Sequence, residues 1–480
     1  MTSYLPAVVT QPLARGVDLL KGTLGGMSWG PALSVSKAAV TSLLNKIEIG
    51  QLVLVDETTG QTSTYGQKIA KEHSRTKKTN GVNGVNGANK RTGGVRKAEL
   101  VVKREAFWVR LFLFADMGFA EAYMLGDFEC EDLTTFFEIF ILNRTQLANG
   151  STVTSSIAAT ITGLARSTNT LSNSLLNIQA HYDISNEMFA AFLSEDMTYS
   201  CAIWKPASSA NVEEETLEQA QMTKLNRFID GAHIKPMDHV LEIGTGWGSF
   251  AIEAVKKTGC RVTSLTLSIE QKALAEKRIA AAGFTDKIEV LLMDYRALPT
   301  PKVLYDKVVS IEMLEAVGAE YLETYFSCIH RLLKKDGIAV FQCITMPEGR
   351  YEAYAKGEDF IRKYIFPGGH LPSISQLVEK ISKGSEGTLV VERIENIGGH
   401  YAKTLRLWRE EFIKNFESRI RPALMTEHEN MGEKEVEVFR RKWIYYFVYC
   451  EAGFATKTLG DAIITVGREG AQELMEGIPL

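Results

Sequence analysis

A glycine-rich turn between an apolar run and a helical pattern constrains this chain more than any other feature. Residues 239–250 read His-Val-Leu-Glu-Ile-Gly-Thr-Gly-Trp-Gly-Ser-Phe, so the apolar run leads into Gly244, Gly246 and Gly248. Glycines at such a turn adopt unusual φ angles and let the backbone approach a ligand closely. Glu242 lies two residues before the first glycine, which differs from the dinucleotide-binding pattern. The spacing fits better a loop that holds the methionine and ribose parts of S-adenosylmethionine (SAM).

The composition indicates a globular protein with a large core. The 480 residues are 45% hydrophobic and 23% charged, a length that suggests two or three domains. The net charge of −4 argues against nucleic acid as a partner. Six scattered cysteines without a Cys-x-x-Cys pair are typical of reduced intracellular thiols and predict no metal site. We expect no membrane-spanning helix and no secretory signal, while a mitochondrial presequence stays open.

The first part of the chain predicts a small α+β domain over residues 15–145, after a flexible segment 1–14. Its expected elements are a helix at 36–46, strands at 50–56, 99–104 and 107–115, and a helix at 133–142. A connecting segment, 146–179, follows, with a helix at 157–164. The catalytic domain is expected over 180–480.

A basic, glycine- and asparagine-rich segment interrupts the N-terminal domain at residues 74–97. It carries no acidic residue and almost nothing to bury, so we expect it to be disordered. It is either a tolerated loop insertion or a polybasic tether for anionic lipid headgroups.

From residue 239 onward, strands alternate with helices. The expected strands are 239–243, 261–267, 288–292, 306–311 and 338–344, with helices at 269–282 and 319–333. This alternation predicts βαβ units around a parallel sheet, the Rossmann-like α/β class. The residues after 345 should form a lid and the last strands.

Ligands bind beyond the carboxyl ends of the strands in such a sheet, so the residues there are candidate site residues. They are Thr266 and Gln271, Asp294 and Tyr295, Glu312 and Glu315, and Gln342 to Ile344. Neutral hydrogen bonds from the first pair suit a ribose, and an acid beside an aromatic ring suits adenine. Alternatively, the first pair caps a helix, Asp294 makes a turn and the two glutamates are solvated.

Several motifs give the chain a resemblance to cyclopropane-fatty-acyl-phospholipid synthases and mycolic acid cyclopropane synthases, from about His181 to Gly470. Besides the glycine loop, they are residues 181–186, 197–202, 215–221, 364–369 and 400–408. The resemblance implies a class I SAM-dependent methyltransferase fold. The N-terminal part resembles, more weakly, the extra domain of the phospholipid-acting synthases. The phrases at 340–342 and 365–369 look like the plant and fungal branch.

The resemblance implies transfer of a methylene group from SAM to a cis double bond of a phospholipid acyl chain. Methyl attack leaves a carbocation, which a bound bicarbonate ion deprotonates, with Glu315 as the onward acceptor. The bicarbonate-binding residues carry over to Cys201, Glu315, Tyr401 and the backbone of Ile344. Gln342 occupies the position of the family's histidine, and Ala316 is a second departure. Tyr199 and Ser200 are expected to contact the carboxylate end of SAM.

The implied partner is unsaturated phospholipid in a membrane surface, so we expect a cytoplasmic, peripherally associated enzyme, with a homodimer as one option. Three other functions stay open: lipid C-methylation without ring closure, small-molecule N-methylation, and non-catalytic lipid binding.

Some residues keep two interpretations. Cys201 is either a nucleophile or a plain buried thiol if it does not hold the anion. His181 and Tyr182 either cover the acyl tunnel or only pack. The aromatic run at 443–449 is either core or the lining of a lipid channel that stabilises a cation.

Overall fold

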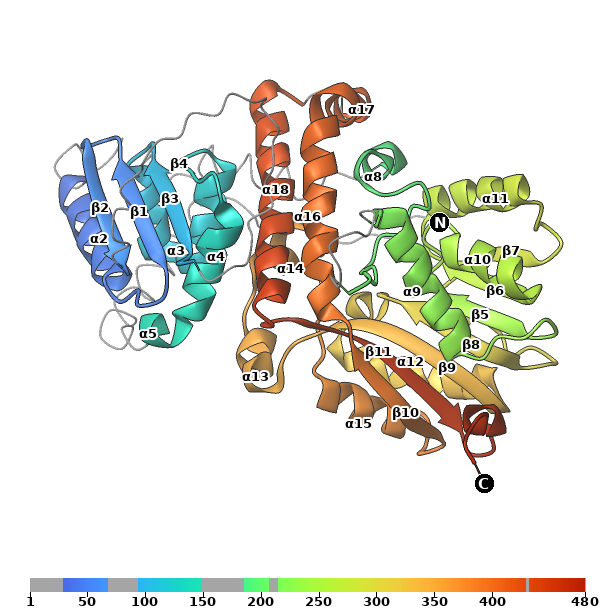
Figure 1. The fold of residues 1–480 in the computed structure, drawn as a ribbon. Helices are drawn as coiled ribbons and strands as arrows, with labels where there is room; N and C mark the ends of the chain where they lie inside the picture. Colours follow the sequence, from blue (N-terminus) through green and yellow to red (C-terminus); the bar gives the residue numbers. More distant parts are fainter. Residues whose placement is uncertain (1–28, 68–93, 149–184, 207–214, 429–430, 480) are drawn as a thin grey trace, which may run out of the picture. The chain divides into compact units, whose positions relative to one another are not determined.

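The computed structural model describes residues 29–67, 94–148, 185–206, 215–428 and 431–479. The chain divides into two compact units, Met1–Ile178 and Gln179–Leu480, which Figure 1 colours from blue to red along the sequence. The predicted flexible segment 1–14, most of the basic segment 74–97, the helix expected at 157–164, and His181 and Tyr182 lie outside the described residues.

The first unit contains a four-stranded sheet in the order β2-β1-β3-β4. Its strands are β1 (Gln51–Asp56), β2 (Gln61–Gly66), β3 (Lys97–Val102) and β4 (Phe128–Glu129), and its helices are α2 (Trp29–Leu44), α3 (Ala106–Met124), α4 (Leu133–Leu142) and α5 (Arg144–Ala148). β1 pairs antiparallel with β2 and parallel with β3. This mixed α+β architecture agrees with the sequence prediction.

The strand expected at 107–115 is wrong, because these residues begin helix α3. A nearly continuous apolar run does not distinguish a buried helix from a buried strand by periodicity alone. Both Phe107 and Trp108 are buried, and the helix is kinked at Ala115, where φ is 49°. The sequence analysis also missed β2, which pairs with β1 across the turn at Gly60.

The second unit is built on a seven-stranded sheet in the order β10-β11-β9-β8-β5-β6-β7. The strands are β5 (His239–Ile243), β6 (Arg261–Thr266), β7 (Ile288–Leu292), β8 (Tyr305–Ile311), β9 (Leu333–Thr345), β10 (Leu389–Asn396) and β11 (Gly460–Arg468). β5 to β9 are parallel to their neighbours in this group, and β11 is antiparallel to both of its neighbours. The predicted Rossmann-like methyltransferase sheet is therefore confirmed.

Helices cover both faces of this sheet (Figure 1). The helices of the second unit are α8 (Asn186–Phe192), α9 (Leu217–Gly231), α10 (Ser249–Thr258), α11 (Ile269–Ala282), α12 (Leu322–Leu332), α13 (Glu348–Lys356), α14 (Phe360–Tyr364), α15 (Ile374–Gly384), α16 (Gly398–Asn415), α17 (Arg421–Glu427) and α18 (Glu433–Ala455). The helix expected at 319–333 starts with a short 3-10 turn, η3 (Ala319–Tyr321). No helix in the described part of the chain is both long and apolar enough to span a bilayer.

The packing of α16 against α18 forms an aromatic part of the core. Trp443, Tyr445 and Phe447 of α18 are almost fully buried. The ring of Trp443 stacks on that of Phe412 from α16, with 6.2 Å between ring centroids. These three side chains therefore belong to the core, which is one of the two interpretations given above for the aromatic run 443–449.

Candidate active site

The glycine loop joins β5 to α10 at the carboxyl edge of the sheet. Gly244, Gly246 and Gly248 all have positive φ, at 101°, 51° and 86°, a region that side chains disfavour. A Cβ atom on Gly246 would meet nothing within 4 Å. The backbone N–H groups of Gly244 and Thr245 both donate to the Leu265 carbonyl at 3.0 Å, which fixes the loop against β6. The loop thus presents open backbone at a position suited to a ligand.

Glu242 lies beneath this loop rather than on its surface. Its residue is only 3% exposed, and its carboxylate accepts a hydrogen bond of 2.5 Å from the Ser264 hydroxyl. Burial raises the pKa of Glu242 to about 8, although the hydrogen bond from Ser264 and the charge of Lys224 oppose the shift. A carboxyl group in this state keeps its proton near neutral pH.

At the end of β6, Thr266 and Gln271 are bonded to each other. The Thr266 hydroxyl donates to Oε1 of Gln271 at 2.9 Å and accepts from the Ser268 N–H at 3.1 Å. Ser268 itself caps α11 through the Gln271 N–H. The capping alternative is wrong for the pair itself, because Ser268 is the N-cap of α11, and a hydrogen bond from the Gln271 amide to a ribose stays a prediction.

Asp294 and Tyr295 follow β7. The Asp294 carboxylate caps the short turn η1 (Tyr295–Ala297) by accepting from the Arg296 N–H at 2.8 Å, and it pairs with the Arg296 guanidinium. Asp294 therefore makes a turn, which is the alternative interpretation given above for this residue. Leu267, Ile269 and Leu292 lie at the same strand ends and are 72%, 66% and 46% exposed. They add apolar surface that a flat base could cover.

Glu312 is the centre of a hydrogen-bonded cluster just after β8. Its Oε1 accepts from the Cys201 N–H at 2.7 Å and from the Gln342 side-chain amide at 2.6 Å. Its Oε2 accepts from the Tyr401 hydroxyl at 2.7 Å. The solvated alternative is therefore wrong for Glu312, which joins residues from three distant parts of the sequence.

Two more acids surround this glutamate. Glu315 accepts from the Ile344 N–H at 2.5 Å, and Asp461 of β11 accepts from the Gln342 amide at 2.7 Å. Asp461 and Ile344 are directly paired in the antiparallel register of β11 and β9. One buried acceptor atom on each of Glu315, Gln342 and Asp461 has no hydrogen-bond partner.

Burial and crowding raise the pKa values of these three acids. Burial raises the pKa of Glu315 to about 8, and the neighbouring charge of Glu312 adds to the shift. Burial and the same neighbouring charges raise the pKa of Asp461 well above its usual range. Burial also raises the pKa of Glu312, while donors and the Lys224 charge oppose this. Such groups titrate as a set, so that few of them are ionised together.

Lys224 of α9 is a buried cation beside these acids, and no sequence motif pointed to it. It is 0% exposed and donates to the Ser200 hydroxyl at 2.5 Å. Burial lowers the pKa of Lys224, and the charge of Glu312 is the largest influence that raises it again. A buried ammonium beside the acids stabilises one ionised carboxylate.

The Cys201 thiol is a buried group held inside the protein. Its Sγ points to the carbonyl oxygens of Ala202 and Ile397, at 3.4 and 3.9 Å. Burial, followed by the charges of Asp461 and Glu312, raises the pKa of Cys201 well above its usual range. A thiol in this state is a poor nucleophile, so the contribution of Cys201 is its backbone N–H.

Tyr199 and Ser200 are also engaged within the protein. The Tyr199 hydroxyl lies 2.9 Å from that of Tyr446, and its ring packs against Trp408, with 5.1 Å between centroids. Ser200 accepts from Lys224, and its carbonyl accepts from the Gln221 amide at 2.8 Å. Ser200 therefore lies against α9, whereas Tyr199 lies against α16 and α18.

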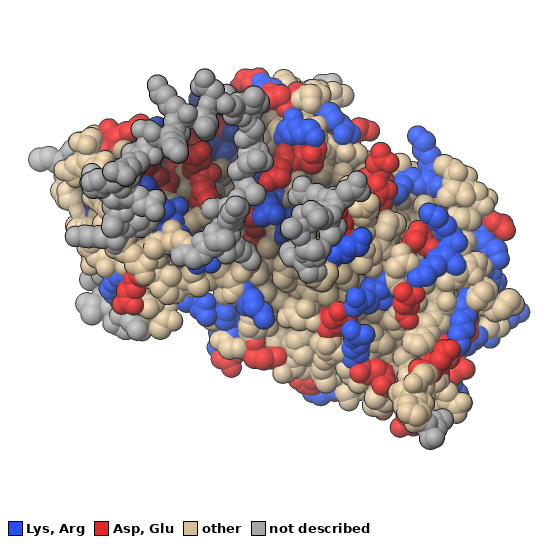
Figure 2. All heavy atoms as spheres, in the orientation of Figure 1, with Lys and Arg blue, Asp and Glu red and all other residues tan. Residues whose placement is uncertain are grey.

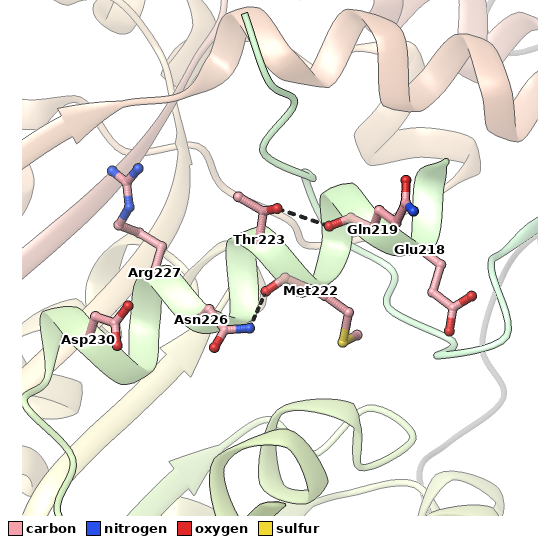
Figure 3. A pocket seen from close by; sticks show the side chains of 7 residues that line it. All are labelled: Glu218, Gln219, Met222, Thr223, Asn226, Arg227 and Asp230. Carbon is pink, nitrogen blue, oxygen red and sulfur yellow. Dashed lines mark hydrogen bonds between the residues drawn. The ribbon is translucent and has the colours of Figure 1, made fainter. Parts of the chain in front are cut away.

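The outer face of α9 borders a separate hollow (Figure 3). Its lining includes Glu218, Met222, Asn226 and Asp230, all on one helix, and none of them is a predicted site residue. Arg227 on this face pairs with Glu395 at 2.6 Å. The hollow is therefore distinct from the acidic cluster, which lies near the opposite face of α9, where Lys224 is buried.

The structure thus brings together Cys201, Glu315, Gln342, Ile344 and Tyr401 around Glu312, and it places Gly244, Gly246, Gly248, Thr266 and Gln271 at the neighbouring edge of the sheet. Sequence reasoning noted Glu312 but gave it no role, and missed Asp461. Asp461 is the only acidic residue in the mainly apolar run 459–466, and this isolated position is the sequence feature that could have indicated it.

Comparison with known proteins identifies the family. Residues 169–461 match the family model described as mycolic acid cyclopropane synthetase. The chain belongs to this family. A tuberculostearic acid methyltransferase of Mycobacterium tuberculosis is 38% identical over 74% of this chain and 79% of its own length. A cyclopropane-fatty-acyl-phospholipid synthase of Escherichia coli is 33% identical over 76% and 87%, respectively.

Solved structures agree with this assignment. Mycolic acid cyclopropane synthase CmaA1, in complex with SAH and CTAB, has a TM-score of 0.51 and 30% identity, covering 61% of this chain and 98% of its own. A coclaurine N-methyltransferase covers 74% of this chain and 99% of its own with a TM-score of 0.54, but its 20% identity shows the fold alone. The protein is a SAM-dependent methyltransferase of the cyclopropane synthase family.

Proposed function

We propose that the protein transfers a methylene group from SAM to a cis double bond of a phospholipid acyl chain and forms a cyclopropane ring. The observation that carries this proposal is the buried acidic cluster at the carboxyl edge of β8 and β9, beside the glycine loop. An alkene is a weak nucleophile and the product of its methylation is a carbocation, so the reaction needs a base in a site that excludes water.

SAM supplies an electrophilic methyl group when it is bound. The open backbone at Gly246 and the Gln271 amide are the groups proposed to hold its methionine and ribose parts, and Leu267 and Ile269 the groups proposed to face its adenine. The aromatic packing around Tyr199 and Trp408 keeps water from the inner side of the site. Glu312 and Glu315 are half-buried residues, and their carboxylates are proposed to face the reacting carbon atoms when the acyl chain is bound.

The bicarbonate ion that the resemblance implies does not fit this arrangement. An anion needs donors, and the Cys201 N–H, the Gln342 amide and the Tyr401 hydroxyl are all directed at Glu312, while the Ile344 N–H is directed at Glu315. The buried oxygen atoms without a partner beside them belong to Glu315, Gln342 and Asp461, and the Glu312 carboxylate already fills the position between the donors. We therefore derive no step through bicarbonate.

A second product is also supported by a specific observation. The relative from M. tuberculosis is named as a tuberculostearic acid methyltransferase, and it matches this chain at 38% identity. After methyl transfer, a hydride shift followed by proton loss would give a branched chain instead of a ring. Both routes use the same donor, acyl chain and base.

The phospholipid substrate implies reversible docking on a membrane from the cytoplasmic side. Figure 2 shows Lys and Arg interspersed with Asp and Glu on the visible described surface. Because the two signs of charge are mixed there, this face attracts anionic lipid only weakly. The N-terminal domain, the basic segment 74–97, or both are proposed to provide the contact with the membrane. Deletion of 75–97 should weaken binding to phosphatidylglycerol vesicles in a sedimentation assay, and unchanged binding would make the segment an inert insertion.

The activity itself is tested by incubating the purified chain with SAM and vesicles of dioleoylphosphatidylglycerol. Proton NMR of the released acyl chains should show ring protons far upfield. Olefinic methylene signals would establish the branched product instead. Vesicle lipid that stays unmodified while SAH accumulates with a water-soluble amine would contradict a lipid substrate.

A further inference from the structure

The backbone of Glu312 has a strained conformation. Its φ is 47°, in the left-handed region that is unfavourable for a residue with a Cβ atom. Its N–H nevertheless donates to the Gln342 carbonyl at 3.0 Å, which anchors it to β9. A strained backbone that carries a buried acid lowers stability twice, so it is expected where the side chain performs a function.

The carboxylate of Glu312 occupies an anion position built from protein donors. A backbone N–H, a side-chain amide and a phenol converge on its two oxygens at 2.6 to 2.7 Å. Cys201, Gln342 and Tyr401 are also residues that the family resemblance assigns to an exogenous anion. A fixed carboxylate and a bound bicarbonate cannot use the same three donors at once.

The surroundings disfavour a second anion and favour one ionised carboxylate. The charge of Glu312 helps to raise the pKa values of Asp461 and Glu315, so a second negative charge in the same space is disfavoured. Lys224 contributes the compensating positive charge from α9. Titratable and charged groups on every neighbouring element interact with Glu312: Lys224, Tyr199, Cys201, Tyr401, Tyr446, Cys343, Glu315 and Asp461.

We propose that Glu312 is a built-in catalytic base that takes the place of a captured bicarbonate ion. The inference rests on the proposed function. When the sulfonium methyl has bonded to one alkene carbon and SAH has left, the neighbouring carbon is a cation. Glu312 then takes a proton from the new methyl group, and the C–H electron pair forms the last ring bond. Before the next turnover the neutral carboxyl group loses this proton to the solvent, and Asp461 and Glu315 can relay it only by releasing the proton that each already holds.

The test compares turnover of the full chain in carbon dioxide-free buffer with and without added bicarbonate. Wild-type turnover should change less than about 2-fold, because the base is part of the protein. Glu312→Gln should lower turnover by roughly 10²-fold or more in both buffers, and Glu312→Asp should recover part of it. Glu323→Gln, an exposed residue on α12, is the matched control and should behave as wild type.

A third variant tests the anion position itself. Glu312→Gly relieves the positive φ and vacates the space between the donors, so added bicarbonate or formate should raise its turnover about 10-fold or more. Calorimetric titration with SAH should give near wild-type affinity for all variants, which shows that they are folded.

The outcomes separate the two proposals. Wild-type turnover that requires bicarbonate, or Glu312→Gln turnover above about a tenth of wild type, would overturn the role of Glu312 while leaving the lipid activity intact. Absence of rescue in Glu312→Gly would contradict the anion position. A wild-type protein that modifies no lipid would overturn the proposed function instead.

Discussion

The Tyr401 hydroxyl donates a hydrogen bond of 2.7 Å to Oε2 of Glu312, although the two residues are 89 positions apart in the sequence. Tyr401 lies in the first turns of α16, and Glu312 lies just after β8. The bond therefore ties the helical layer to the edge of the sheet. A phenol that donates to a carboxylate favours its ionised form.

Tyr401→Phe should raise the pKa of Glu312 further, because the carboxylate loses a donor. A base must be deprotonated, so activity rises with pH through its pKa. We expect the acidic limb of the profile of kcat/KM against pH to move to higher pH and turnover near neutral pH to fall about 10-fold. Tyr321→Phe, at an exposed position, is the control, and an unshifted profile for Tyr401→Phe would contradict the role of this bond.

Glu315→Gln should lower turnover by roughly 10²-fold with SAM affinity nearly unchanged. Burial and the charge of Glu312 hold the pKa of Glu315 at about 8, which suits a group that exchanges protons with Glu312 near neutral pH. Single-turnover kinetics and calorimetry measure the two quantities separately. A variant with normal turnover would remove Glu315 from the proton path.

Cys201→Ala should keep turnover within about 10-fold of wild type, because only the backbone N–H of this residue reaches Glu312. A nucleophilic cysteine would be essential, and its loss would lower turnover by about 10³-fold or more. Trapping of a covalent adduct with an alkylating analogue offers a second readout. A labelled Cys201 would contradict the assignment.

Gly246→Ala should weaken SAM binding more than it weakens the fold. The change costs about 1 kcal/mol of backbone strain and puts a methyl group into the open space above the loop. Gly283→Ala is a matched control, since Gly283 also has positive φ and open surroundings but ends α11. Calorimetry should show reduced SAM affinity for Gly246→Ala only, and equal affinities would place the ligand elsewhere.

Glu242 should make the fold less stable as pH rises. Its pKa is raised from 4.5 to about 8, so the folded state binds the extra proton between these values and loses the advantage as pH rises through them. At about 1.4 kcal/mol per pKa unit, the loss is a few kcal/mol at most. Urea unfolding at pH 5 and pH 8 should show a smaller difference in Glu242→Gln than in wild type or in the exposed control Glu289→Gln. An equal difference would contradict the buried acid.

The parallel strands were predictable because local signals coincide there. The prediction of β5 at 239–243 is confirmed to the residue, since an apolar run ends at the glycine loop. The helix predicted at 269–282 also agrees, because Ser268 caps its start and Gly283 ends it. The first residues of α3 resemble a strand because they are apolar apart from Arg110, which is itself buried.

The acidic cluster was only partly predictable. The positions of Glu312 and Gln342 follow from the rule that ligands bind at strand ends. The contact of Gln342 with Asp461 depends on the register of β11 against β9, which no local pattern specifies. Lys224 comes close to the acids only because the inner face of α9 packs against Ser200. Its electrostatic role therefore depends on tertiary packing, which no local pattern predicts.

The most direct test of a base acting on the transferred group uses SAM whose methyl group carries three deuterium atoms. The acyl product, analysed by mass spectrometry, should contain two deuterium atoms, because Glu312 removes one of them after methyl transfer. A product that retains all three would show that no proton leaves the transferred methyl group, and it would contradict the mechanism.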